Sequence, residues 1–217
     1  MHSSRTELYH FRPLYLLLFY AAVYVAITFV NNNYILNSTL YYNSLSDHLP
    51  IAQVNVVMES MKRWEWLGYL LCLFIVPAKA LLVSACIYTA MALGENKITF
   101  PTVFRVVLVA ELIPLTAALA RMGWLLIHNA SSLQEMQYFY PLSLLSLFKA
   151  GSLPAWCLYL FQLLNVFEIL YWLALAFGIR QFLLRSFGES LRLVSVSYGF
   201  GLFVWVVIII FVQIQIS

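Results

Sequence analysis

The sequence predicts an all-α, polytopic transmembrane helical bundle. Of the 217 residues, 63% are hydrophobic and only 10% are charged, and the mean hydropathy is +0.86. A soluble domain carries about 25% charged residues, so this chain lacks the polar surface needed to face water. Apolar stretches long enough to cross a bilayer also recur along the whole chain. These observations together place most of the protein inside or beside a membrane.

Five segments reach the roughly 20 apolar residues that a spanning helix needs. The expected spans are about 13–30, 67–93, 101–128, 154–179 and 193–214. Residues 1–217 are therefore expected to form one transmembrane domain. Between the third and fourth spans, Ser132-Leu133-Gln134-Glu135 matches a capping box and predicts the start of a short helix.

Lysine and arginine positions predict the orientation, because cytoplasmic flanks carry the excess of these residues. With the N-terminus inside, seven of them lie on inner flanks and three on outer flanks. The inner ones are Arg5, Arg12, Lys97, Arg105, Arg180, Arg185 and Arg192, and the outer ones are Lys62, Arg63 and Lys149. We therefore expect the N-terminus in the cytoplasm and, with five spans, the C-terminus outside.

Charged residues near the middle of the predicted spans are the main candidates for a site. Lys79, Glu111 and Glu168 lie at similar depth. A charge at the bilayer centre costs about 2.5–3.5 kcal/mol on insertion scales, so such residues normally face a partner or water. Opposite signs at matching depth predict an interhelical ion pair or triad. Gln162 and Asn165 precede Glu168 at steps of three, which would place all three on one face of the fourth helix.

We interpret this polar cluster as a structural clasp between helices, because polar side chains commonly join membrane helices in this way. A substrate or proton site at the same position is the alternative interpretation.

Motifs for catalysis and cofactor binding are missing from the sequence. Cys72, Cys86 and Cys157 lack CxxC spacing, which argues against a zinc site and against a thioredoxin-like motif. The four histidines show no HExxH or paired spacing. No cluster of lysine and arginine is dense enough to indicate nucleic-acid binding. We therefore expect no enzymatic activity, no metal, no cofactor and no nucleic-acid partner.

Two stretches of the chain carry a resemblance to a known family. In residues 94–114, a short polar turn leads into an apolar helix, with the landmarks Thr99-Phe100, Phe104-Arg105 and Ile113-Pro114. In residues 167–198, a span ends at Phe177-Gly178 and a basic linker returns into the last helix. With the five-span topology, these patterns resemble the Yip family, membrane proteins first known as partners of Ypt/Rab GTPases. The similarity covers about half of the chain.

Only about a dozen residues precede the first span, so the chain looks like the short bacterial branch of that family. The resemblance implies a non-enzymatic accessory or scaffold protein, Yip-like, that acts in membrane organisation, trafficking or the assembly of a membrane protein complex. It also implies a multi-pass protein of the cell membrane, specifically a bacterial inner membrane. It transfers no catalytic residue to this chain.

The alternative function is a small transporter, or a transporter subunit, that uses the midplane charges Lys79, Glu111 and Glu168. Under either hypothesis, membrane lipids and other membrane proteins are the expected partners, in a homo- or hetero-oligomer. Small residues at Gly199-Phe200-Gly201 and Ala174-Leu175-Ala176 would let another helix approach closely. Three arginines are expected either to set topology or to meet anionic lipid headgroups: Arg180, Arg185 and Arg192.

The orientation can be tested with reporter fusions. A periplasmic reporter fused after Ser217 should be active, and a cytoplasmic reporter at the same position should be inactive, because five crossings from an inner N-terminus end outside. The reverse pattern of reporter activity would mean either that the charge count gives the wrong orientation or that the number of spans is even.

Overall fold

The structure is a computed structural model that describes residues 12–36, 38–45, 50–94, 98–128, 132–149, 152–183 and 186–216. These residues form a helical bundle, and five of its helical segments are long and apolar enough to cross a membrane, as the sequence predicts. The segments are α2 (Pro13–Val30) with the π-helix η2 (Asn31–Ile35), α4 (Ile51–Leu93), α5 (Phe100–Ala110) with α6 (Leu112–His128), α9 (Val166–Leu183) and α10 (Phe187–Ile216). The shorter elements are α3 (Ser38–Leu45), α7 (Leu133–Tyr138), the 3-10 helix η3 (Leu144–Leu147) and α8 (Ala155–Leu163).

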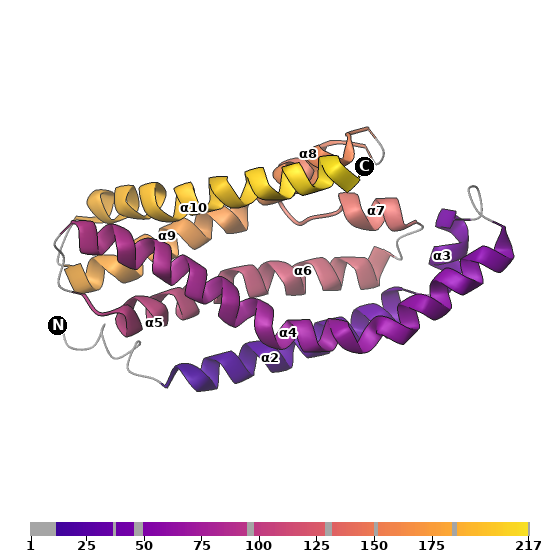
Figure 1. Ribbon diagram of the computed structural model, residues 1–217, viewed down its shortest axis with the longest axis horizontal. Coiled ribbons are helices and arrows are strands. Elements are labelled where there is room, and N and C mark those ends of the chain that lie inside the picture. Colours follow the sequence, from indigo (N-terminus) through magenta and orange to yellow (C-terminus); the bar gives the residue numbers. More distant parts are fainter. Residues whose placement is uncertain are drawn as a thin grey trace.

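The long helices run roughly along one axis (Figure 1). Helix α4 crosses the bundle obliquely and packs against α2, α5 and α10, whereas α9 packs against α5, α6 and α10. Helix α2 begins toward one end of the molecule and α10 ends at the other, as an odd number of crossings requires.

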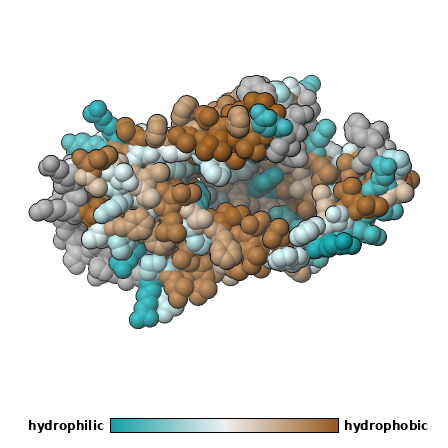
Figure 2. All heavy atoms as spheres, in the orientation of Figure 1, coloured by the Kyte–Doolittle hydropathy of each residue, from teal (hydrophilic) through white to brown (hydrophobic). Residues whose placement is uncertain are grey.

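The outward faces of the long helices are apolar. Brown side chains cover the C-terminal half of α10 and parts of α4 in Figure 2. Phe203 and Phe211 of α10 are 65% and 62% exposed, and Phe74 of α4 is 62% exposed. Such a dense apolar surface is suited to lipid tails and not to water. Between the diverging parts of α4 and α10 the surface is hollowed, with hydrophilic atoms at its floor.

Helix α4 extends well beyond the expected second span of 67–93. It has 43 residues, which corresponds to about 64 Å at 1.5 Å per residue. The hydrocarbon core is only about 30 Å thick, so the polar first part of α4 projects past it. Helix α3 packs on α4, and the Tyr42 hydroxyl donates a hydrogen bond to Asn55 of this projecting part. A hydropathy criterion detects only the apolar half of such a helix.

The third span is interrupted at its middle. Helix α5 ends at Ala110, Glu111 lies between the helices, and α6 begins at Leu112. Pro114 occupies the first turn of α6 and has no N–H to donate to the carbonyl of Ala110. The interruption therefore lies next to the buried glutamate that the sequence marks as a site candidate.

The expected fourth span of 154–179 is not one continuous helix. Helix α8 ends at Leu163 and α9 starts at Val166, so only α9 meets the length and hydropathy of a span. Backbone groups at this break bond to the turn that leads into η3. Leu144 N–H donates to the Leu164 carbonyl at 2.9 Å, and Val166 N–H donates to the Leu142 carbonyl at 3.1 Å. Non-helical backbone at such a position is tolerated only where protein satisfies it, as it does here.

The short helix expected from the capping box is confirmed. Helix α7 begins directly after Ser132, whose hydroxyl accepts a hydrogen bond from Glu135 N–H at 3.2 Å. The apolar stretch after Pro141 forms η3 and an isolated bridge between Ser143 and Asn165.

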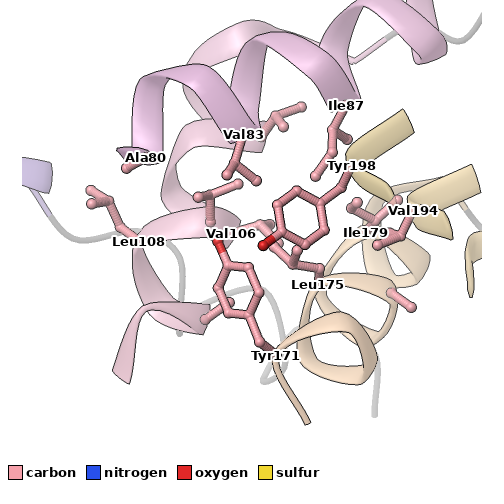
Figure 3. Close-up of a cluster of buried hydrophobic side chains, with 14 of the residues drawn as sticks. Ala80, Val83, Ile87, Val106, Leu108, Tyr171, Leu175, Ile179, Val194 and Tyr198 are labelled. Carbon is pink, nitrogen blue, oxygen red and sulfur yellow. The ribbon is translucent and has the colours of Figure 1, made fainter. Parts of the chain in front are cut away.

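The core lies where α4, α5, α9 and α10 meet. Tyr171 of α9 and Tyr198 of α10 lie there among aliphatic side chains, and Figure 3 shows both rings in this cluster. The aliphatic neighbours include Val83, Val106 and Leu175, each at most 5% exposed.

The small residues that the sequence offered for another chain pack largely within this chain. A Cβ atom at Gly199 would lie 2.9 Å from the ring of Trp172, and one at Gly201 would lie 2.9 Å from Cys86 Sγ. Ala176 is fully buried in the core. Close helix approach is therefore used to join α10 to α9 and α4.

The packing at Gly199 predicts the direction in which a substitution changes the stability of the protein. Gly199→Ala should destabilise the protein by about 1–3 kcal/mol, the range for overpacking, because the Trp172 ring is held by a hydrogen bond and cannot swing away. Gly123→Ala is the matched control, because nothing lies within 4 Å of its added Cβ. That change should stabilise by about 0.5–1 kcal/mol. Thermal unfolding of both variants in detergent measures the difference, and equal stabilisation would contradict the described contact.

Candidate functional site

The side chain of Glu111 is the centre of the candidate site. It is only 3% exposed and lies at the break between α5 and α6. Its Oε2 accepts a hydrogen bond from Lys79 Nζ of α4 at 3.0 Å, and its Oε1 accepts one from the Tyr171 hydroxyl of α9 at 2.8 Å. We call Lys79, Glu111 and Tyr171 the Glu111 clasp. It joins three of the membrane-spanning segments through one carboxylate.

The geometry of the clasp suits a site of low dielectric. An uncompensated buried charge is strongly destabilising, and a buried pair is tolerated only when further hydrogen bonds satisfy the remaining lone pairs. Tyr171 supplies such a bond to Glu111. The Lys79 Nζ atom also lies 4.7 Å from the centre of the Tyr171 ring, where a cation is attracted to the aromatic face. Each member of the clasp therefore interacts with both others.

Tyr20 of α2 is connected to the same region by a hydrogen bond to the backbone of α5. Its ring is fully buried, and its hydroxyl donates to the carbonyl of Leu108, three residues before Glu111. The N-terminal helix is thus attached to α5 beside the interruption. Four spanning segments converge there when α2 is included.

Glu168 forms a second polar centre, at the start of α9. Its Oε1 accepts hydrogen bonds from the Trp172 indole N–H at 2.8 Å and from the Tyr198 hydroxyl of α10 at 2.8 Å. The positive end of the helix dipole favours a negative charge in this first turn. We call Glu168, Trp172 and Tyr198 the Glu168 clasp.

Asn165 is the N-cap of α9 and explains why the helix starts there. Its Oδ1 accepts a hydrogen bond from Glu168 N–H at 2.8 Å, which satisfies one of the free donors of the first turn. Its Nδ2 donates to the carbonyls of Gln162 and Leu163 at the end of α8. One side chain therefore bridges the break between the two helices.

The structure brings together some of the candidate residues and separates others. Lys79 pairs with Glu111. Of the expected ion pair or triad, the structure forms the pair and not the triad, because Glu168 bonds to Trp172 and Tyr198 instead. Gln162 belongs to α8 and Glu168 to α9, so the expected single helical face does not exist.

The two clasps touch through their aromatic members. The rings of Tyr171 and Tyr198 lie 5.5 Å apart in an edge-to-face arrangement (Figure 3). The ring of Trp172 lies 5.6 Å from that of Tyr198. The sequence analysis missed these three residues, although Tyr171 and Trp172 fall three and four positions after Glu168, the spacing of helical neighbours.

The basic residues near the last loop lie apart from both clasps. Arg180 near the end of α9 and Arg192 early in α10 are exposed, at the end of the bundle where these two helices are connected. Arg185 lies outside the described residues. Exposure at one end of the bundle is compatible with either role expected for them, in topology or in contact with lipid headgroups.

Comparisons with protein-family profiles, with curated proteins and with solved structures found no match for this chain. Within the described residues, no group of three or more His, Cys, Asp or Glu side chains is arranged to hold a metal ion. The chemistry of the site must therefore be read from the two clasps themselves. They hold carboxylates inside the bundle and connect its helices.

The Lys79–Glu111 pair gives the next prediction. Lys79→Met should destabilise the protein by about 2 kcal/mol, because it leaves the Glu111 charge buried. This is less than the ~3–5 kcal/mol typical of a fully buried pair, since the Lys79 side chain is 38% exposed. Unfolding of the purified protein in detergent is the measurement.

Two double variants provide the control. Lys79→Met with Glu111→Gln should recover most of the lost stability, because the unpaired charge is gone. Lys79→Met with Glu168→Gln should recover none, because Glu168 does not contact Lys79. Equal behaviour of the two double variants would contradict the pairing.

Proposed function

We propose that this protein is a non-enzymatic accessory or scaffold protein that organises or assembles other components of the cell membrane. The proposal rests on one observation: the polar groups at the midplane form hydrogen bonds with one another inside the bundle. Lys79 and Glu111 satisfy each other, and Glu168 accepts hydrogen bonds from α9 and α10. A carboxylate engaged in this way serves to hold helices together.

The outward surface supports the same proposal. The faces of α4 and α10 that do not enter the core present large apolar side chains. A bundle that is fixed from within can present these faces to lipids and to other membrane helices without changing its own shape. The resemblance of residues 94–114 and 167–198 to the Yip family points in the same direction.

A photo-crosslinking scan in native membranes tests this function. A photoreactive amino acid is placed at exposed positions of three helices, such as Leu14, Phe74 and Phe203. A scaffold should give crosslinks to one defined set of proteins, confined to one face of the bundle. Crosslinks to lipid alone from every position, together with a lone chain of 25.0 kDa plus detergent after mild extraction, would overturn the proposal.

A second candidate function is a small transporter, or a subunit of one. The specific observation in its favour is the break between α8 and α9, which places a helix N-terminus and Glu168 beside non-helical backbone. Interrupted helices of this kind form the substrate sites of many secondary transporters.

A flux measurement separates the two functions. Purified protein in liposomes that contain a pH-sensitive dye is given a pH gradient, and Glu168→Gln is compared with the original chain. The scaffold function predicts no protein-dependent proton flux from either. A flux that Glu168→Gln abolishes, while its unfolding temperature stays within a few degrees, would support the transporter.

A further inference from the structure

A cavity of about 340 Å³ lies between η2, α3 and α4, and its lining shares no residue with either clasp. Its lining combines polar and apolar side chains, and its size is that of a small-molecule site. The lining residues are Asn32, Asn33, Leu36, Tyr41, Met58, Met61, Lys62 and Glu65.

The two charged residues of the cavity do not neutralise each other. Lys62 and Glu65 are three positions apart on α4, a spacing at which opposite charges often pair. In the described part of the chain, however, they form no ion pair, and no described residue accepts a hydrogen bond from Lys62. One positive and one negative group therefore border the same space.

Only one of the two oxygens of the Glu65 carboxylate is hydrogen-bonded to described residues. Its Oε1 accepts hydrogen bonds from Asn32 Nδ2 and from the Tyr69 hydroxyl, both at 3.1 Å. Oε2 has no hydrogen-bond partner among the described residues. The carboxylate is thus oriented and keeps one oxygen available.

The backbone at this position is also unusual. Asn31–Ile35 form a π-helical turn directly after α2, and such turns are rare and frequent at functional sites. Two of the turn's asparagines line the cavity, and one of them holds Glu65. Asn33 Nδ2 donates to the Phe29 carbonyl at 2.9 Å, so the turn offers Asn32 to Glu65 and places Asn33 in the cavity wall.

Two tryptophans indicate the depth of the cavity in the membrane. Trp64 and Trp66 flank Glu65 in α4 and are 58% and 57% exposed, and the apolar part of α4 follows directly. Exposed tryptophans of a membrane protein favour the headgroup level. The cavity consequently lies where lipid headgroups are found.

We propose that this cavity binds a zwitterion that carries a primary ammonium and a phosphate, the chemistry of an aminophospholipid headgroup. Lys62 binds the phosphate, and the free oxygen of Glu65 accepts hydrogen bonds from the ammonium. Leu36, Met58 and Met61 contact the adjoining carbon chain. This site is separate from the clasps and does not depend on the scaffold function.

The test uses the purified full chain in detergent, and native mass spectrometry of bound dioleoyl lipids. Phosphatidylethanolamine should bind at least about tenfold more tightly than phosphatidylcholine, which has no N–H, or phosphatidylglycerol, which has no ammonium. Glu65→Gln should abolish this preference, and Lys62→Met should weaken phosphatidylethanolamine binding about tenfold. The matched controls, Glu59→Gln and Arg63→Met, remove exposed charges of the same helix that do not line the cavity, and should change nothing.

Two further arms complete the test. Glycerophosphoethanolamine is a water-soluble compound with the same headgroup, and it distinguishes a lipid ligand from a free one. If it competes with phosphatidylethanolamine at similar concentration, the ligand is a zwitterion taken from water. If it does not compete, the ligand is the lipid. Met58→Trp fills the cavity while both charges remain, and should block binding even where Glu65→Gln lowers the folded yield. Equal binding of all three lipids by the original chain, or unchanged preference in Glu65→Gln and Met58→Trp, would overturn the proposal.

Discussion

A carboxylate buried in the middle of a membrane bundle must find its hydrogen-bond donors within the protein, and the arrangement around Glu111 follows from this constraint. Lys79 and Tyr171 reach the carboxylate from α4 and α9. The break between α5 and α6 lies at the same residue. The relative positions of three spanning segments are thereby set by one side chain, and Tyr20 adds a fourth.

The sequence predicts the class of the fold and the charged members of the site. Long apolar stretches identify the spans, and the cost of a charge in hydrocarbon marks Lys79, Glu111 and Glu168 without any structural information. The pairing of Lys79 with an acidic residue follows from charge and depth. The sequence does not predict that Lys79 pairs with Glu111 and not with Glu168, because the rotation of each helix about its axis decides which carboxylate faces Lys79.

Other features of the site have no strong signal in the sequence. Tyr171 and Tyr198 are two of 14 tyrosines, and only their three-dimensional position gives them a role. The break at Leu164 and Asn165 lies inside an apolar stretch, and hydropathy averaged over a window passes across it. The projecting start of α4 is too polar for the same criterion, although it is continuous with a spanning helix.

The two backbone hydrogen bonds between residues 142–144 and 164–166 give the connection before α8 a structural role. By position it is a connecting loop, and loops usually tolerate insertions. Here the backbone of Leu144 and the carbonyl of Leu142 complete the hydrogen bonding of an interrupted membrane helix. A tag or epitope placed in this stretch would expose unpaired polar backbone to an apolar environment. For protein engineering, residues 142–144 therefore belong to the scaffold of the fourth crossing, and their length and register must be preserved.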